Sequence, residues 1–379
     1  MLTKREIFNE LNRLTKSILL IGPRQSGKST LIKQLQPDVE FNLADQETFL
    51  QFLRDPTFLK KNIGQAKKIF VDEVQRVPSV LNTIQVLIDN NPKLQFYLTG
   101  SSARKLKRGQ ANLLPGRILT FELGPLTSAE LGKDFDLNRA LSRGLLPGVY
   151  WQDSDKLAYK TLSSYALTYL KEEIQAESLT RNLEGFSRFF EVVASRSGDF
   201  TDFSKFSSQA MIERTSARRY FDILVDTLVV NKVESFSKSS KRRLVQHPRY
   251  YFFDIGVLNG CLNNFVVSAD RKGMLFEHLF LQNVLSSAKS NDEEIYVSVY
   301  RTEAGAEVDF IIQKKNQLYA VEVKATKNIG VHDLRGLKSF SEFYGKKHRS
   351  IIVYLGEREL EIDGIQCLPF VKAMEIIGF

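Results

Sequence analysis

Residues 22–29 read Gly-Pro-Arg-Gln-Ser-Gly-Lys-Ser, and this stretch decides how the N-terminal part of the chain folds. It follows the apolar run SILLI and precedes STLIKQL, which has helical periodicity. The spacing GxxxxGK[ST] between a strand and a helix is typical of a loop whose backbone N–H groups surround a phosphate. A glycine-rich turn with a chance lysine is the alternative, and the flanking strand and helix disfavour it.

This loop predicts a site for ATP and Mg²⁺. The Lys28 ammonium would reach the β- and γ-phosphates, and the Ser29 hydroxyl would hold the metal ion. We expect the nucleotide to be bound by a set of loop residues and one residue from a later strand: Gly22, Pro23, Arg24, Gln25, Ser26, Gly27, Lys28, Ser29, Thr30 and Thr99.

A second apolar run, KKIFVDE at 67–73, ends in two acids. Asp72 would lie beside the Mg²⁺ bound to Ser29, and Glu73 would act as the general base that activates water. Strands often end in acids, so this pattern is specific only because it follows a phosphate loop. The presence of Glu73 favours hydrolysis of ATP over a site that only binds it.

A third strand, FYLT at 96–99, ends in polar residues that could sense the γ-phosphate. Thr99 and Ser101 are the candidates, and capping of a turn is the alternative role. The basic segment that follows offers an arginine that could reach a neighbouring subunit's nucleotide. Arg117 is the first candidate and Arg104 the second, and a solvated basic loop is the alternative.

The motifs GPRQSGKST, IFVDEVQRVP, YLTGSSARKL and LPGRI resemble the AAA+ ATPase module of a bacterial and archaeal family. In that family the module is joined to a C-terminal domain long described as of unknown function. The resemblance covers roughly residues 15–125. It implies an AAA+ fold, ATP sites near subunit interfaces, and a homo-oligomer assembled as a hexameric ring.

The middle of the chain has the pattern of a winged helix-turn-helix, with three helices followed by a basic hairpin. The segment from Arg214 has apolar residues on one face and arginines on the other, and SKSSKRRLVQHPR contains no acid. The pattern predicts DNA binding that is non-specific or structure-dependent, and a protein-binding module is the alternative. The candidate contacts are Arg214, Arg218, Arg219, Lys241, Arg242 and Arg243.

The C-terminal part carries four residues whose order resembles the core of PD-(D/E)xK nucleases: Glu277, Asp309, Glu322 and Lys324. Val308 replaces the proline of that pattern. The resemblance implies that Asp309 and Glu322 bind Mg²⁺, that Lys324 orients water, and that Glu277 adds a ligand or positions the lysine. Glu303 and Glu307 are competing carboxylates, and a domain that keeps these residues only for binding remains the alternative.

These patterns predict an α/β protein with an N-terminal AAA+ P-loop domain, a helical winged-helix middle and a C-terminal restriction-endonuclease-like α/β domain. We place the ATPase core at 1–135, a helical lid or linker at 136–180, the winged helix at 181–247 and the nuclease-like domain at 248–379. A chain of 379 residues, of which 43% are hydrophobic, is long and apolar enough to form several globular cores.

Composition sets the remaining limits. The chain has 53 Lys and Arg against 44 Asp and Glu, a net charge of +9, which fits a polyanionic partner or simply solubility. Two distant cysteines exclude a disulfide scaffold and a cysteine-rich zinc module. No apolar run is long enough to span a membrane, so we expect a cytoplasmic protein that does not bind membranes.

Two functions agree with the sequence. The first is an ATP-hydrolysing motor that acts on DNA, such as branched or recombination intermediates, with an attached Mg²⁺-dependent nuclease-like domain. The second is an ATP-dependent regulatory switch or scaffold with an inactive nuclease-like domain and a protein-binding winged helix. A small-molecule phosphotransferase is disfavoured because two further domains would have no role.

Overall fold

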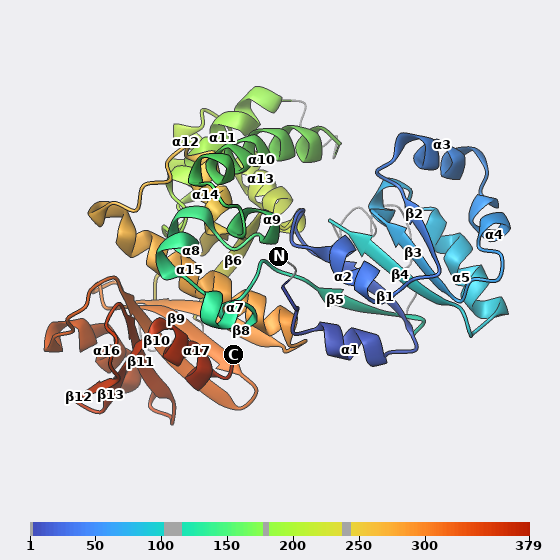
Figure 1. Ribbon diagram of the computed structural model, residues 1–379. Helices are drawn as coiled ribbons and strands as arrows, with labels where there is room; N and C mark the ends of the chain where they lie inside the picture. Colours follow the sequence, from blue (N-terminus) through green and yellow to red (C-terminus); the bar gives the residue numbers. More distant parts are fainter. Residues whose placement is uncertain (1–2, 102–115, 177–181, 237–243) are drawn as a thin grey trace.

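The computed structural model describes residues 3–101, 116–176, 182–236 and 244–379. Figure 1 shows the N-terminal sheet at one side, the helical middle above, and the C-terminal sheet at the other side. The helices are α1 (Phe8–Arg13), α2 (Lys28–Gln34), α3 (Gln46–Arg54), α4 (Phe58–Asn62), α5 (Val80–Asn90), α7 (Ser128–Leu131), α8 (Leu137–Arg143), α9 (Pro147–Tyr150), α10 (Asp155–Ala176), α11 (Leu183–Ser195), α12 (Phe203–Gln209), α13 (Arg214–Asp226), α14 (Ile255–Cys261), α15 (Ala269–Ser290), α16 (Arg335–Tyr344) and α17 (Phe370–Ile377).

The strands are β1 (Ser17–Ile21), β2 (Val39–Asn42), β3 (Lys68–Asp72), β4 (Gln95–Gly100), β5 (Ile118–Glu122), β6 (Val230–Ser235), β7 (Arg249–Phe252), β8 (Ile295–Arg301), β9 (Glu307–Lys314), β10 (Gln317–Lys324), β11 (Arg349–Tyr354), β12 (Leu360–Ile362) and β13 (Ile365–Pro369). Short 3-10 turns lie at Val74–Arg76, Gly132–Asp134 and Val331–Leu334.

The N-terminal sheet has five parallel strands in the order β2-β3-β4-β1-β5. Its central strands are continuous apolar runs because helices cover both faces of a parallel sheet. Strand β4 lies between β1 and β3, so the carboxyl ends of these three strands are neighbours. This order brings the phosphate loop, Asp72 and Thr99 to the same edge of the sheet, and it confirms the predicted parallel α/β sheet.

The middle of the chain is helical, and its core is rich in aromatic side chains. Phe189 and Phe221 meet edge to face with ring centroids 4.9 Å apart, and Phe221 stacks on Tyr250 of β7. Helices α11, α12 and α13 pack together before the chain enters the β6–β7 pair. This part of the chain is helical, as predicted, and residues 237–243 lie outside the described residues.

The C-terminal sheet is mixed and has eight strands in the order β12-β13-β11-β10-β9-β8-β6-β7. Strand β9 runs antiparallel to both of its neighbours, β8 and β10, and β10 and β11 are parallel. The β6–β7 hairpin joins this sheet through parallel pairing of β6 with β8. The boundary predicted between the winged helix and the nuclease-like domain, at 247/248, therefore lies between two paired strands of one sheet.

Helix α15 connects the parts of the molecule. It packs on β10 of the C-terminal sheet, on α8 and α14 of the helical middle, and on β5 of the N-terminal sheet. Its middle is almost entirely buried, which is why the sequence from Leu275 to Ser290 shows no clear amphipathic stripe. One helix thus contributes to the packing of all three parts.

Two glycines allow a close approach between the segment after α8 and the start of α14. Gly144 has φ +71°, and a Cβ at this position would collide with the Asp254 carboxylate. A Cβ at Gly256 would collide with the carbonyl group of Arg143. The fully buried Asp254 accepts hydrogen bonds from Leu145 N at 2.8 Å and Gln282 Nε2 at 2.9 Å.

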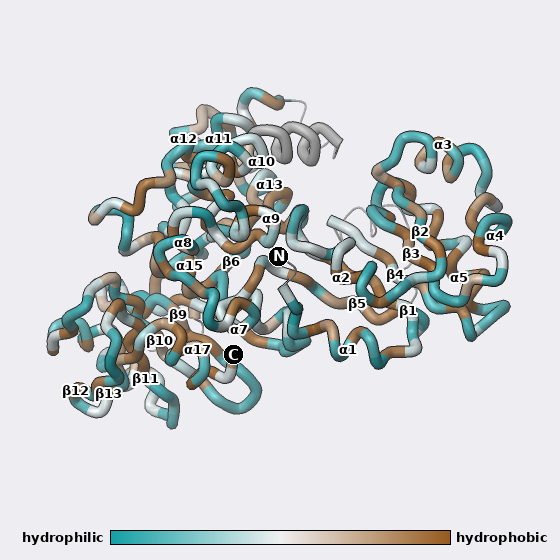
Figure 2. Tube along the Cα trace, viewed as in Figure 1, coloured by the Kyte–Doolittle hydropathy of each residue, from teal (hydrophilic) through white to brown (hydrophobic). Residues whose placement is uncertain are grey.

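Hydropathy along the chain agrees with this packing. Figure 2 shows hydrophobic and hydrophilic residues alternating along the helices, as expected for helices with one face on a core. Within the described residues, no helix combines the length and apolar character needed to cross a bilayer.

Candidate functional site

The phosphate loop leaves β1 and enters α2 as the sequence predicts. Gly27 has φ +94° at the start of α2, a conformation that glycine adopts without strain. A Cβ at Gly22 would collide with the carbonyl oxygen of Leu123, so this position requires glycine as well. The buried Lys28 donates through Nζ to the carbonyl oxygens of Gly22 and Pro23, both at 2.8 Å. The lysine ammonium is thereby held against the loop that would cradle the phosphates.

Three predicted residues meet beside this loop. Ser29 Oγ lies 2.8 Å and 3.0 Å from the two carboxylate oxygens of Asp72. The Thr99 hydroxyl donates to the same carboxylate from the end of β4. A hydroxyl and a carboxylate are hard oxygen donors of the kind that Mg²⁺ prefers. Ser29 and Asp72 therefore fit the metal role that the sequence assigns to them.

Glu73 has a left-handed backbone, with φ +59° and ψ +45°, which is uncommon for a residue with a side chain. Its N–H donates to Thr99 Oγ1 at 3.2 Å. Its carboxylate accepts a hydrogen bond from the side-chain amide of Gln75, whose Nε2 also lies 2.9 Å from Ser101 Oγ. Gln75 thus connects the candidate general base to the end of β4, and sequence reasoning did not find it.

Residues from distant parts of the chain support the phosphate loop. The buried Arg5 donates to Ser26 O at 2.7 Å and to Gly124 O at 2.9 Å, and pairs with Glu130 at 2.8 Å. Tyr165 of α10 donates through its hydroxyl to Arg24 O at 3.2 Å. Arg5 was missed because only the fold brings it to the loop.

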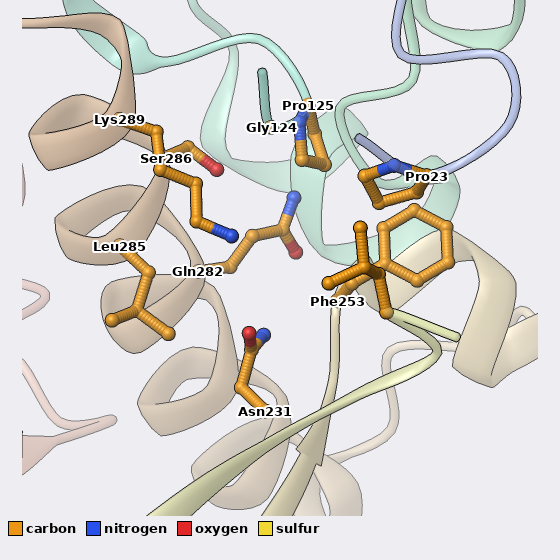
Figure 3. A pocket seen from close by; sticks show the side chains of 10 residues that line it. Pro23, Gly124, Pro125, Asn231, Phe253, Gln282, Leu285, Ser286 and Lys289 are labelled. Atoms are coloured by element: carbon orange, nitrogen blue, oxygen red, sulfur yellow. The ribbon is translucent and has the colours of Figure 1, made fainter. Parts of the chain in front are cut away.

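Behind the loop lies a cavity of about 10 Å³, large enough for about one water molecule. Figure 3 shows Pro23 of the loop near Phe253, with Gly124 and Pro125 next to it and Gln282 and Ser286 of α15 across the pocket. A Cβ at Gly124 would lie 2.6 Å from Ser286 Oγ, so the backbone approaches α15 closely here. The nucleotide site is therefore packed directly against the helix that continues into the C-terminal domain.

Of the two arginines that are candidates to reach a neighbouring subunit's nucleotide, the structure describes one. Arg117 forms a bidentate ion pair with Asp89, with Nε at 2.6 Å and Nη2 at 3.1 Å. Both side chains are partly exposed, which leaves Arg117 on the surface of a single subunit. Arg104 lies outside the described residues.

The predicted C-terminal carboxylates are brought together. Asp309 of β9 accepts from Val323 N of β10 at 2.8 Å, and Lys324 Nζ pairs with Glu322 Oε1 at 2.7 Å. The other oxygen of Glu322 is buried and has no hydrogen-bond partner in the part of the chain that the structure describes. Burial, with the nearby Asp309 charge adding to it, raises the pKa of Glu322 to about 8. This cluster of buried acids is one that a cation would stabilise.

Glu277 on α15 joins the same cluster. Burial raises its pKa to about 8, and the charge of Asp309 acts in the same direction. Burial likewise raises the pKa of Asp309. The Glu322 oxygen that has no partner among the described residues and the carboxylate of Asp309 are oxygen donors of the kind that Mg²⁺ prefers. They are two protein ligands only, because no group of three or more His, Cys, Asp and Glu side chains among the described residues is arranged to hold a metal ion.

Arg249 of β7 is the residue at this site that the sequence did not reveal. It is only 6% exposed and donates to Glu277 Oε1 at 3.0 Å and to Glu307. The Tyr251 hydroxyl donates to the same Glu277 oxygen at 2.7 Å. Of the two competing acids, Glu307 therefore belongs to the cluster, while Glu303 is exposed in the turn after β8. A basic residue followed by an apolar strand was the only sequence signal for Arg249.

The candidate nucleic-acid contacts on α13 lie on its exposed face. Arg214, Arg218 and Arg219 are exposed, while Ala217, Phe221 and the other apolar residues of the helix face the core. The remaining candidates, Lys241, Arg242 and Arg243, lie outside the described residues.

Comparisons with known families divide the chain into three. Residues 14–132 match the profile of an AAA domain, which places an AAA-type ATPase domain at the N-terminus. Residues 134–267 and 272–373 match two domains of unknown function, DUF8612 and DUF4143. The nuclease-like character of the C-terminal part is not among these matches.

The proteins that are similar to this chain have low sequence identity to it. The uncharacterized protein Rv2008c of Mycobacterium tuberculosis is 26% identical, over 93% of this chain and 79% of that protein. An uncharacterized protein of Haemophilus influenzae is 22% identical over 92% of both chains. Two solved structures were also matched: the STAND protein PH0952 from Pyrococcus horikoshii (TM-score 0.24, 13% identity, 76% of this chain and 46% of that one) and protein VC1899 from Vibrio cholerae (TM-score 0.23, 12% identity, 95% and 96%).

Proposed function

We propose that this protein hydrolyses ATP and uses the energy to act on DNA, as a motor that works on branched or recombination intermediates. The observation that carries the ATPase part is the meeting of Ser29, Asp72 and Thr99 beside Glu73 at one edge of the parallel sheet. A hydroxyl, a carboxylate and a base at the end of a phosphate loop are the groups that phosphoryl transfer to water requires.

Each residue has a role in this chemistry. Lys28 is positioned to bind the phosphates, and the backbone N–H groups of the loop add further donors. Ser29 and Asp72 would hold a Mg²⁺, which would supply positive charge beside the phosphates. Glu73 takes the proton from the attacking water, and Thr99 joins the base to the metal-binding carboxylate.

DNA as partner is supported by charge and by the helical middle. The net charge of +9 favours a polyanion, and α13 presents three exposed arginines that can replace counterions on a phosphate backbone. In the C-terminal domain, Asp309 and Glu322 would hold a Mg²⁺ that polarises a phosphodiester, with Lys324 orienting the water. A nuclease-like domain of this kind suits a DNA substrate.

A second candidate is an ATP-dependent switch or scaffold whose C-terminal domain does not cleave. The observation that favours it is Arg249, which already neutralises Glu277 and Glu307 inside the carboxylate cluster. A site that contains its own cation has less need of a metal ion. The helical middle would then recruit a protein rather than DNA.

The test is the steady-state ATPase rate of the full chain with and without single-stranded, duplex and four-way-junction DNA. The motor predicts turnover that depends on Lys28 and rises with at least one DNA. A Lys28→Ala variant that still hydrolyses ATP would contradict the assignment of the nucleotide site. Turnover by the wild type that ignores every DNA would favour the switch or scaffold.

We further propose that the protein acts as a homo-oligomeric, hexameric ring in which Arg117 reaches the neighbouring subunit's ATP. In the single subunit Arg117 is paired with Asp89 at the surface, where a partner could take its place. Lys28→Ala and Arg117→Ala subunits should be inactive alone and regain activity when mixed, because one mixed interface would hold both intact groups. Mixtures that stay inactive, or a monomer in sedimentation with ATP, would contradict the ring.

A further inference from the structure

A cavity of about 480 Å³ opens where the helical middle meets the C-terminal sheet. Its wall is made by the segment after α11, by α12, by β7 and β8, and by α15. Three cations line it, Lys205, Arg249 and Arg301, together with Phe200, Met274 and two acids, Asp199 and Glu277. The volume is in the range of pockets for small organic ligands and is larger than a phosphate ion needs.

The three cations are held in different ways. Arg249 is buried and paired with Glu277 and Glu307, yet its Nε has no hydrogen-bond partner among the described residues. Arg301 Nη1 lies 3.7 Å from Glu307 Oε2, a long contact that leaves its other donors for a ligand. Lys205 is exposed and has no ion-pair partner among the described residues. A ligand entering the cavity would therefore meet the exposed Lys205 and the partly exposed Arg301 before it meets the buried Arg249.

The cavity also has an apolar side. Phe200 lies under both guanidinium groups, with its ring centroid 4.1 Å from Arg249 Cζ and 4.8 Å from Arg301 Cζ. These contacts hold the arginine planes in place, because stacking on an aromatic face limits the conformations of a guanidinium. Met274 adds a polarisable surface of the kind that adapts to flat rings. Cations beside apolar surface suit a ligand with a phosphate and a ring.

The position of the cavity connects it to the carboxylate cluster. Glu277 is both part of the cavity wall and a partner of Arg249 and Tyr251. Arg249 in turn contacts Glu307 at the start of β9, the strand that carries Asp309. A ligand in the cavity therefore lies next to the predicted nuclease-like site and not at the P-loop.

We propose that this cavity binds a nucleotide, with Lys205 and Arg301 contacting its phosphate and Phe200 and Met274 facing its sugar and base. The phosphate can belong to a DNA strand or to a free mononucleotide, since both present the same chemistry. Assigning it to a strand rests on the proposed function. If the phosphate belongs to a DNA strand, the cavity would hold the nucleotide next to the phosphodiester on which Asp309 and Glu322 act.

The experiment is calorimetric titration of dTMP into the full chain carrying Lys28→Ala, which disables the other phosphate site. Binding should weaken about tenfold with Lys205→Ala and again with Arg301→Ala, because a charge-assisted hydrogen bond contributes that much. Lys347→Ala, which removes an exposed lysine before β11, should leave dTMP binding unchanged. Lys205 is exposed, so its variant keeps the fold even if Arg301→Ala lowers the melting temperature.

Failure to bind dTMP, or equal binding by the wild-type pocket and Lys205→Ala, would overturn the inference even if DNA still stimulates the ATPase. A 5′-phosphorylated oligonucleotide that competes with dTMP identifies the strand as the source. An oligonucleotide that does not compete supports a pocket for a free mononucleotide. In that case the nucleotide site stands, and the proposal that this domain holds DNA is contradicted.

Discussion

The side-chain amide of Gln75 donates to the carboxylate of Glu73, two residues before it, and the same nitrogen lies 2.9 Å from Ser101 Oγ. Gln75 is buried, and its side-chain carbonyl oxygen has no hydrogen-bond partner within residues 3–101, 116–176, 182–236 and 244–379. The turn Val74–Arg76 makes this contact possible because it folds the chain back toward β4. Gln75 is therefore a positioning residue for the base, not a group that touches ATP.

Gln75→Ala should lower kcat for ATP about tenfold with little change in KM, since the phosphate loop is untouched while the base loses its support. Steady-state ATPase assays measure both constants. In a Glu73→Gln background the same substitution should have no further effect. An additional loss in that background would mean that Gln75 acts elsewhere.

Arg249→Met should destabilise the C-terminal domain by about 3 kcal/mol, because it leaves two partly buried glutamates without their buried cation. Urea unfolding followed by circular dichroism measures this loss. Arg358→Met, at an exposed arginine, serves as the matched control and should be close to neutral. Equal unfolding midpoints for the two variants would refute a structural role for Arg249.

Asp309→Asn should remove Mg²⁺-dependent nicking of DNA and leave ATPase turnover intact, because the two sites use separate carboxylates. A gel assay on linear and branched DNA with Mg²⁺ or Mn²⁺ follows the cleavage. Glu303→Gln changes an exposed acid in the nearby turn and should cleave like the wild type. If the wild type nicks no DNA, the C-terminal domain binds without cleaving.

Substituting Arg214, Arg218 and Arg219 together by alanine should reduce the salt dependence of DNA affinity by up to about three counterions. Fluorescence anisotropy between low and moderate salt gives the slope. Lys156→Ala with Lys160→Ala removes two exposed lysines of α10 and is the control. A slope that is unchanged in the α13 variant would assign this helix to a protein partner.

The stability of the fold should depend on pH through Asp254. Burial raises its pKa to about 6, and the groups around it are neutral: backbone N–H groups of Leu145, Gly256 and Val257 and the amide of Gln282. The folded chain thus holds this proton more tightly than the unfolded chain does. Stability is fully present below about pH 4 and is lost as pH rises through about 6, by about 3 kcal/mol. Glu277 and Glu322, whose pKa values are also raised, add a pH dependence to both proteins. Unfolding compared from pH 4 to 7 should therefore show a steeper loss of stability in the wild type than in Asp254→Asn.

The nucleotide site was predictable because its parts are local or ordered along the chain. The loop at 22–29 and the acids at 72 and 73 each follow an apolar strand, and parallel strands place such ends together. Thr99 could be named because β4 ends in polar residues, although nothing in the sequence decided between a sensor and a cap. The structure gives Thr99 contacts to Asp72 and Glu73.

Arg5, Gln75 and Arg249 could not be predicted, because their partners are set by tertiary packing. Arg5 is 125 residues from Glu130, and Arg249 is 58 residues from Glu307. The choice between Glu303 and Glu307 also required the structure: β9 begins at Glu307, whereas Glu303 is left in the turn that precedes it. Spacing along the chain carries no information on such contacts.

Helix α15 is 22 residues long and spans about 33 Å, with Glu277 in its first half and the loop-facing Gln282, Ser286 and Lys289 beyond it. A chimera that exchanges the C-terminal module between related chains has to divide or transfer this helix. Transferring it replaces the surface behind the phosphate loop, and dividing it breaks a buried segment. Because the two modules share this helix, we expect the C-terminal module and the surface behind the phosphate loop to change together during evolution. Exchange of the C-terminal module alone is disfavoured.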